Sequence, residues 1–228
     1  NDTLIFALES GGEQHVILTA VGQDAYMWRG KVIEADTLLE AGRPIVVYDS
    51  LSVREGVTLS MAAGVQLYFH DGANLWVHGR IVAEGTVDRP VVFRGDRTDR
   101  MFDYLPYDNT PSRWGGIRLK ATSTDNRLNH VDIHSASYGI ACDSSSTDVM
   151  KLTLENSVIH NVGGEGLGLY HCRASVGNTQ ISNTLGHCVA VVGGWAEFVH
   201  CTLAQFYPWD AALSLIHISE PTRRTPIS

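Results

Sequence analysis

Four residues have side chains whose types and spacing could do chemistry: His130, Asp132, His134 and His160. Residues i, i+2 and i+4 of an extended strand share one face, so the first three would point the same way if 130–134 is a strand. Imidazoles beside a carboxylate could act as a general base or as metal ligands. The ordinary alternative is a solvated polar ladder on the outside of a sheet. We predict these four residues as catalytic candidates, with no metal ion and no cofactor.

A short strand pattern that occurs four times between residues 129 and 205 would position these side chains. Its apolar anchors are 26, 22 and 22 positions apart: Ile133, Ile159, Ile181 and Leu203. A period of this length, with no helical pattern between copies, predicts a parallel β-solenoid. The anchors and the column Val131/Ser157/Thr179/Cys201 would point inward. Three columns would point outward: His130/Asn156/Asn178/His200, Asp132/Val158/Gln180/Thr202 and His134/His160/Ser182/Ala204. His134 and His160 would then be neighbours on adjacent coils, about 4.8 Å apart.

Short apolar runs separated by glycine-bearing corners continue the pattern over 44–212. Strands this short, with glycine where the backbone turns sharply, predict three strands per coil. Residues 26–43 are predicted to be a linker or an N-terminal cap. The ladder Ser135/Asn161/Asn183/Gln205 is predicted to be structural, because stacked amides and hydroxyls satisfy one another along a solenoid.

Three segments carry a more specific pattern: Gly79-Arg80-Ile81-Val82-Ala83-Glu84-Gly85-Thr86, Arg89-Pro90-Val91-Val92-Phe93 and Trp114-Gly115-Gly116-Ile117. They resemble the coil signature of right-handed parallel β-helix repeat proteins, which are abundant among exported and surface lipoproteins of Bacteroidetes-type bacteria. The resemblance covers Pro44 to about Ala212. It implies an all-β, three-sheet, right-handed parallel β-helix at the cell surface, at the outer membrane or outside the cell. It implies no activity, because fold alone does not carry function.

The two ends of the chain read differently from the coils. Two apolar runs flank the turn cluster Ser10–Glu13 and predict a β-hairpin within 1–25. This hairpin resembles the last strands of an immunoglobulin-like sandwich domain of exported bacterial proteins, which would be truncated here. The segment Leu213–Arg223 resembles the in-frame translation of a sequencing adapter. We therefore predict that 213–228 is a non-native tail and that the β-helix is cut short near Ala212.

A long insertion at 96–113 interrupts the regular coils. Loops of this length on a regular scaffold are either functional or packed over it. Aromatic and arginine side chains here could form a sugar-stacking platform with charged rims. The predicted ligand-binding residues are Arg97, Arg100, Phe102, Tyr104, Tyr107, Arg113 and Trp114. The alternative is that the aromatic rings fold back and cover the sheet.

Composition narrows the classes of function. A net charge of −8 argues against nucleic-acid binding, which needs a basic face. No apolar run approaches the roughly 20 residues that span a bilayer. The four cysteines, Cys142, Cys172, Cys188 and Cys201, lack the spacing of a zinc or redox motif. We predict buried free thiols, although a bridge between stacked cysteines stays open.

The repeated coils lack the residues that two known β-helix chemistries need. Lyases acting on uronates need a base and a cation, and these four coils have no outward Lys or Arg. Glycoside hydrolases need two carboxyl groups, and the columns supply only Asp132. We therefore predict a non-catalytic surface protein that binds glycans or mediates adhesion. The alternatives are a lyase-like polysaccharide-active enzyme, which would bring His130, Asp132, His134 and the loop arginines into one cleft, and a structural stalk.

Overall fold

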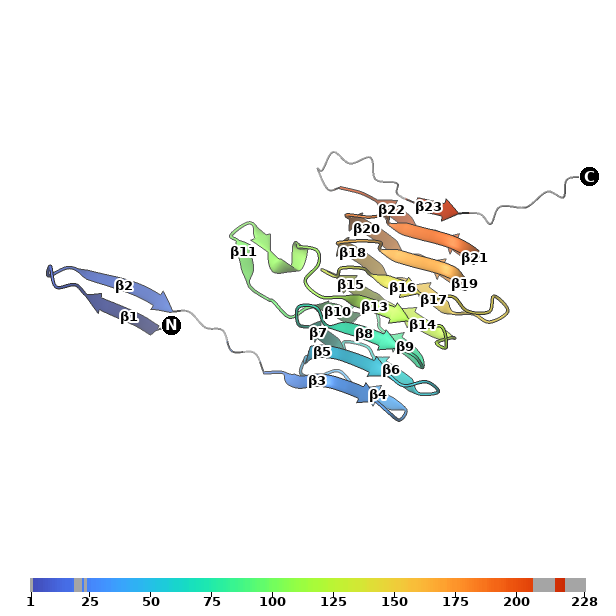
Figure 1. The fold of residues 1–228 in the computed structure, drawn as a ribbon, viewed down its shortest axis with the longest axis horizontal. Coiled ribbons are helices and arrows are strands. Elements are labelled where there is room, and N and C mark those ends of the chain that lie inside the picture. Colours follow the sequence, from blue (N-terminus) through green and yellow to red (C-terminus); the bar gives the residue numbers. More distant parts are fainter. Residues whose placement is uncertain (1, 19–21, 23, 207–215, 220–228) are drawn as a thin grey trace, which may run out of the picture.

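The computed structural model describes residues 2–18, 22, 24–206 and 216–219. The protein is all-β, and its large parallel sheet forms a β-solenoid of about 8 turns. Figure 1 shows the strands stacked coil upon coil, with the chain advancing along the solenoid axis from β3 to β21. No helix in the described part of the chain is long and apolar enough to cross a bilayer.

Parallel pairing between coils produces three stacks of strands, as the glycine-bearing corners predicted. The first stack contains the start of β3 (Tyr26–Ile33), the start of β5 (Ile45–Val53), β7 (Gln66–Phe69), β10 (Val91–Gly95), β15 (Val131–His134), β18 (Val158–Val162), β20 (Gln180–Thr184) and β22 (Thr202–Ala204). The second contains the ends of β3 and β5, β8 (Asn74–Val77), β13 (Gly116–Leu119), β16 (Ile140–Cys142), the starts of β19 (Leu167–Gly177) and β21 (Val189–Val199), and β23 (Ile216–Ser219). The third contains β4 (Thr37–Leu39), β6 (Thr58–Ala62), β9 (Arg80–Glu84), β14 (Asn126–Asn129), β17 (Leu152–Glu155) and the ends of β19 and β21.

The predicted register of the four repeats is confirmed. Ile133 pairs with Ile159, Ile159 with Ile181, and Ile181 with Leu203. The first three of these side chains are fully buried, and Leu203 packs against the same core. The apolar inward positions of all three stacks meet along the axis, so one continuous core runs through the coils.

Residues in the left-handed region of backbone space recur at matching positions in the later coils of the first stack. Four of these residues have φ between 47° and 54°: His130, Asn156, Asn178 and His200. Three more have φ between 51° and 61°: Ser135, Asn161 and Asn183. Asn tolerates this conformation better than most residues. The Asn183 amide donates to the Asn161 side chain over 3.4 Å, so that part of the predicted structural ladder is present.

Two segments differ from the expected organisation. Residues 26–43, expected as a linker or cap, contain β3 and β4, which pair in parallel with β5 and β6, so the coils begin before Pro44. At the other end, β23 pairs in parallel with β21. An open coil edge offers unpaired backbone groups to any extended segment that reaches it. The remainder of the predicted tail lies outside the described residues.

The hairpin and the thiols can also be placed. Strands β1 (Asp2–Ala7) and β2 (Glu13–Leu18) form a separate antiparallel pair, in which every residue is exposed. This hairpin therefore does not pack on the first coil. The four cysteines are unbridged. Three of them are buried as predicted, whereas Cys201 is only partly buried.

Candidate functional site: a carboxylate–histidine cluster beside a groove

The outer face of the first stack positions the predicted chemistry. Asp132 and His134 point outward from β15, and His160 points outward from the next coil, where it pairs in register with His134. The two imidazole rings stack with centroids 4.8 Å apart and planes tilted by 26°. The distance expected from coil spacing is therefore confirmed.

Asp132 links the two histidines. Its Oδ1 lies 2.8 Å from Nδ1 of His134 and 3.3 Å from Nε2 of His160. The side chain of His134 is 9% exposed, against 27% for His160. His134 is thus the enclosed member of the pair, and His160 is the accessible one.

The insertion loop closes the other side of His134. This loop contains β11 (Arg100–Phe102), β12 (Leu105–Pro106) and the 3-10 turn η1 (Tyr107–Asn109), and it projects beside β15 and β18 (Figure 1). From η1, Asp108 places its Oδ1 3.2 Å from Nε2 of His134 and 2.6 Å from a guanidinium nitrogen of Arg94. The Ser135 hydroxyl donates to the Asp108 carbonyl. We call Asp108, Asp132, His134 and His160 the Asp–His cluster.

His134 is charged at neutral pH in this arrangement. Burial alone would lower its pKa, but hydrogen bonds to Asp108 and Asp132 and the two negative charges outweigh burial and raise the pKa to about 9. Burial alone would raise the pKa of Asp132, whereas hydrogen bonds from His134 and His160 hold it well below its usual range. His134 therefore donates to both carboxylates and is not a free general base.

His130 does not join the Asp–His cluster, although its spacing suggested a shared face. It precedes β15 in a corner with φ 49°, so its side chain leaves the alternation of the strand. Its Nδ1 is buried without a hydrogen-bond partner. His130 lines the same groove as Asp132, but it lies at the start of β15, away from His134.

The predicted loop platform separates into three parts. Trp114 is 1% exposed and stacks on Phe69 with centroids 4.4 Å apart, so it belongs to the core and not to a ligand surface. The guanidinium groups of Arg97 and Arg113 lie over the Tyr107 ring, at 3.7 and 5.8 Å from its centroid. A large aromatic ring finds its lowest free energy out of water, and Trp114 follows that rule.

The tip of the loop keeps its aromatic rings in solvent. Phe102 and Tyr104 are 54% and 81% exposed, and they stack in parallel with centroids 5.6 Å apart. Arg100 donates to the carbonyl oxygen of Asp103, which ties the tip together. Of the proposed platform, Phe102 and Tyr104 therefore remain available to a ligand.

Two adjoining grooves cross the outer face of β15, β18 and β20. One, of about 470 Å³, is lined by Asn109, Val158, His160, Asn161, Gln180, Ser182, Asn183 and Phe206. The other, of about 500 Å³, is lined by Thr86, Val87, Pro90, His130, Val131, Asp132, Asn156, Ser157, Val158, Asn178 and Gln180. They share Val158 and Gln180, so together they form one open trough, which we call the coil groove.

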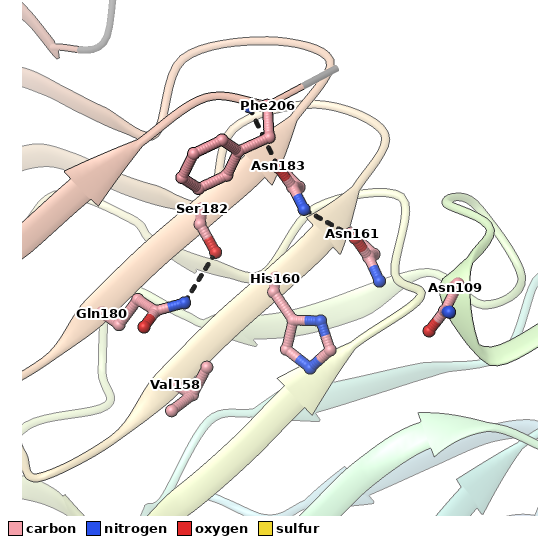
Figure 2. Close-up of a pocket in the computed structure, with 8 residues that line it drawn as sticks. All are labelled: Asn109, Val158, His160, Asn161, Gln180, Ser182, Asn183 and Phe206. Atoms are coloured by element: carbon pink, nitrogen blue, oxygen red, sulfur yellow. Dashed lines mark hydrogen bonds between the residues drawn. The ribbon is translucent and has the colours of Figure 1, made fainter. Parts of the chain in front are cut away.

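Figure 2 shows how side chains from different elements meet in the first of these grooves. His160 lies between Asn109 of the insertion loop and the side chains of β20. The Gln180 amide donates to the Ser182 hydroxyl over 3.0 Å, and Phe206 at the rim donates its backbone N–H to Asn183 over 3.1 Å. This groove therefore presents polar side chains beside Val158 and Phe206, and the amides of Gln180 and Asn183 are held in place by hydrogen bonds.

Two residues of the site, Arg94 and Asp108, were missed by sequence reasoning. Arg94 follows Phe93, which pairs with Ile133, so Arg94 occupies the same outward column as His134 one coil earlier. That signal was present in the sequence, because the inward Phe93 aligns with the anchors of the later coils. Asp108 left no such signal, since a contact made by a loop is not set by strand alternation.

Comparison with protein-family models, with curated proteins and with solved structures finds no match to this chain.

Proposed function

We propose that this protein is an exported surface protein that binds neutral glycan chains in the coil groove without cleaving them. The observation that carries the proposal is the groove itself, an open trough that crosses three coils and presents amide and hydroxyl side chains beside apolar ones. Amides both donate and accept hydrogen bonds, as sugar hydroxyls do. An open trough admits a polymer along its length, whereas a closed pocket admits only a chain end.

Exposed aromatic rings add to this proposal. Phe206 at the rim is 73% exposed, and the stacked Phe102 and Tyr104 lie at the loop tip. Rings with an exposed face offer apolar area to the C–H faces of sugars at little entropic cost, because they have few rotatable bonds. A structural stalk would need neither the groove nor these rings.

The charges favour a neutral glycan over a uronate. Arg94, the cation in the column of His134, is paired with Asp108 at 2.6 Å, and its side chain is 14% exposed. The positive charge of His134 is shared by two carboxylates. A uronate carboxylate in the groove would be repelled by Asp132. Neither Arg94 nor His134 has a free positive charge to offset that repulsion. This arrangement also disfavours the lyase-like alternative, which neutralises such a carboxylate before removing a proton.

A glycan array with neutral and acidic polysaccharides tests the proposal. We expect binding to a neutral glycan and about a tenfold weaker affinity after Gln180→Ala, because Gln180 borders both grooves. Thr153→Ala is the matched control, since Thr153 points outward from β17 in the third stack. Equal affinity of the wild type and Gln180→Ala would reject the coil groove. If the protein released shortened or unsaturated products, the proposal of binding without cleavage would be wrong and the protein would be an enzyme.

A further inference from the structure

Three donor atoms of the Asp–His cluster converge on one point of the outer face. Asp132, His134 and His160 each offer one ligand atom, and these atoms all lie within 4.8 Å of one another. Within the described part of the chain, no other three carboxylate, thiol or imidazole side chains come together in this way. The residues come from two adjacent coils whose register is set by buried anchors, so the scaffold holds them in place.

The separations suit a small metal ion. A tetrahedral site with bonds of about 2.0–2.2 Å separates its donor atoms by about 3.3–3.6 Å. Oδ1 of Asp132 lies 2.8 Å from Nδ1 of His134 and 3.3 Å from Nε2 of His160. A displacement of a few tenths of an ångström would open the shorter separation, and the metal would replace the proton between Nδ1 and Oδ1.

The side of His134 away from this point carries the partner that metal-binding histidines usually have. Asp108 Oδ1 lies 3.2 Å from Nε2 of His134, so it accepts the proton of that nitrogen and leaves Nδ1 to face the metal. A carboxylate behind a ligating imidazole fixes its tautomer and orientation. Arg94 in turn holds Asp108 at 2.6 Å.

The remaining side of the cluster opens to the groove. Asp132 lines one half of the coil groove and His160 lines the other. A metal held by three protein ligands keeps a fourth position for water or a ligand oxygen, and here that position would face the trough.

We propose that Asp132, His134 and His160 bind one divalent transition-metal ion, for which zinc is the best match. Two imidazoles and one carboxylate suit zinc and its first-row neighbours, whereas calcium and magnesium prefer all-oxygen sites. The proposal goes beyond glycan binding and does not rest on it. Sugar binding without metal binding would support the proposed function alone, and metal binding without sugar binding would support the metal site alone.

Isothermal titration with ZnCl₂ tests the site, using untagged protein that has been stripped with EDTA. We expect one zinc per chain, and a loss of affinity of more than about 100-fold in His160→Gln, since outer partners alone are worth 10–100-fold. Asp108→Asn should weaken binding by about 10–100-fold. Cobalt(II) titrated into the same samples should give the visible absorption of a tetrahedral centre in the wild type and lose it in His160→Gln.

The control is a histidine–carboxylate pair on another part of the same stack. His70 Nδ1 lies 2.7 Å from Asp96 Oδ2, and the His70 side chain is half exposed. Among the described residues, this pair has no third side chain that could complete a metal site. His70→Ala should bind zinc as the wild type does. Zinc affinity that is unchanged in folded His160→Gln, checked by circular dichroism, or a wild type without one-to-one binding, would overturn the proposal.

Discussion

Lys151 and His134 are both largely withdrawn from solvent, yet the solenoid compensates them in opposite ways. Lys151 is 0% exposed and donates its Nζ protons to the carbonyl oxygens of Lys120 at 2.7 Å and Ser123 at 2.9 Å. Its burial lowers the pKa of the amine. His134 lies between two carboxylates that raise its pKa to about 9. Carbonyl dipoles accept the hydrogen bonds of the first cation, whereas carboxylates accept those of the second.

The surroundings of Lys151 are closed, whereas those of His134 border the coil groove. Around Lys151, Asn126 is also fully buried, and it accepts from the Ile81 N–H and donates to the Lys151 carbonyl, both at 2.9 Å. The buried side-chain atoms without a partner, among the described residues, lie elsewhere: His130 Nδ1, Ser145 Oγ and Arg173 Nε. We call Ser123, Asn126 and Lys151 the lysine corner. It is closed and fully paired, whereas the Asp–His cluster borders a groove, so only the latter can meet a ligand.

Removing the core ring that donates a hydrogen bond to the backbone of His134 should have the largest effect. Trp114 stacks on Phe69, and its indole N–H donates to the His134 carbonyl at 2.8 Å. Trp114→Ala should lower the free energy of unfolding by about 3–5 kcal/mol, because it leaves a large cavity. Guanidinium denaturation measures the loss. Trp195→Ala, at a ring that is 42% exposed, should cost less than about 1 kcal/mol. Equal losses would show that Trp114 is not the structural residue of the pair.

Changing the lysine corner should cost stability without touching the groove. Lys151→Met keeps most of the volume but leaves the carbonyl oxygen of Ser123 without its donor, whereas the carbonyl oxygen of Lys120 keeps the backbone N–H of Ser123. The expected loss is about 1–3 kcal/mol in the same denaturation experiment. Zinc titration of the variant should match the wild type. If Lys151→Met kept its stability but changed its affinity for zinc, the lysine corner would affect the binding site and not the stability of the fold, contrary to this expectation.

Releasing the insertion loop should have a smaller and local effect. Asp108→Asn removes the charge that Arg94 and His134 share, a contribution of about 1.5 kcal/mol for a charged hydrogen bond. In metal-free protein, amide exchange across 96–113 should speed up by about tenfold, with the coils unchanged, as read by hydrogen-exchange mass spectrometry. Asp99→Asn is the control, because Asp99 pairs with Arg97 on the exposed side of the same loop. Equal acceleration in both variants would mean that Asp108 does not pin the loop.

Strand alternation made the coils readable from sequence. The anchor position of each coil is apolar and buried, so the spacing of Ile133, Ile159 and Ile181 determined the register. The contact between His134 and His160 follows from that register. Arg94 was equally accessible by extending the alignment to Phe93.

Corners and loops were less readable because other forces decide them. The recurrence of Asn or His at 130, 156, 178 and 200 is the mark of a left-handed corner, and the corner at His130 keeps its side chain out of the Asp–His cluster. Asp108 and Lys151 are fixed by contacts between segments far apart in the chain. No local pattern encodes such contacts.

The smallest effect on stability is expected at the loop tip, where binding should change instead. Phe102→Ala combined with Tyr104→Ala should alter the free energy of unfolding by no more than about 0.5 kcal/mol, because both rings are exposed. If the rings stack on sugar, affinity for the neutral glycan identified on the array should fall about threefold to tenfold, which corresponds to about 0.5–1.5 kcal/mol for an aromatic contact. Met101→Ala in the same strand, at a side chain that is 38% exposed, is the control for a change in loop surface alone. Unchanged affinity in the double variant would confine glycan recognition to the coil groove, and a large loss of stability would show that the tip packs on the solenoid in solution.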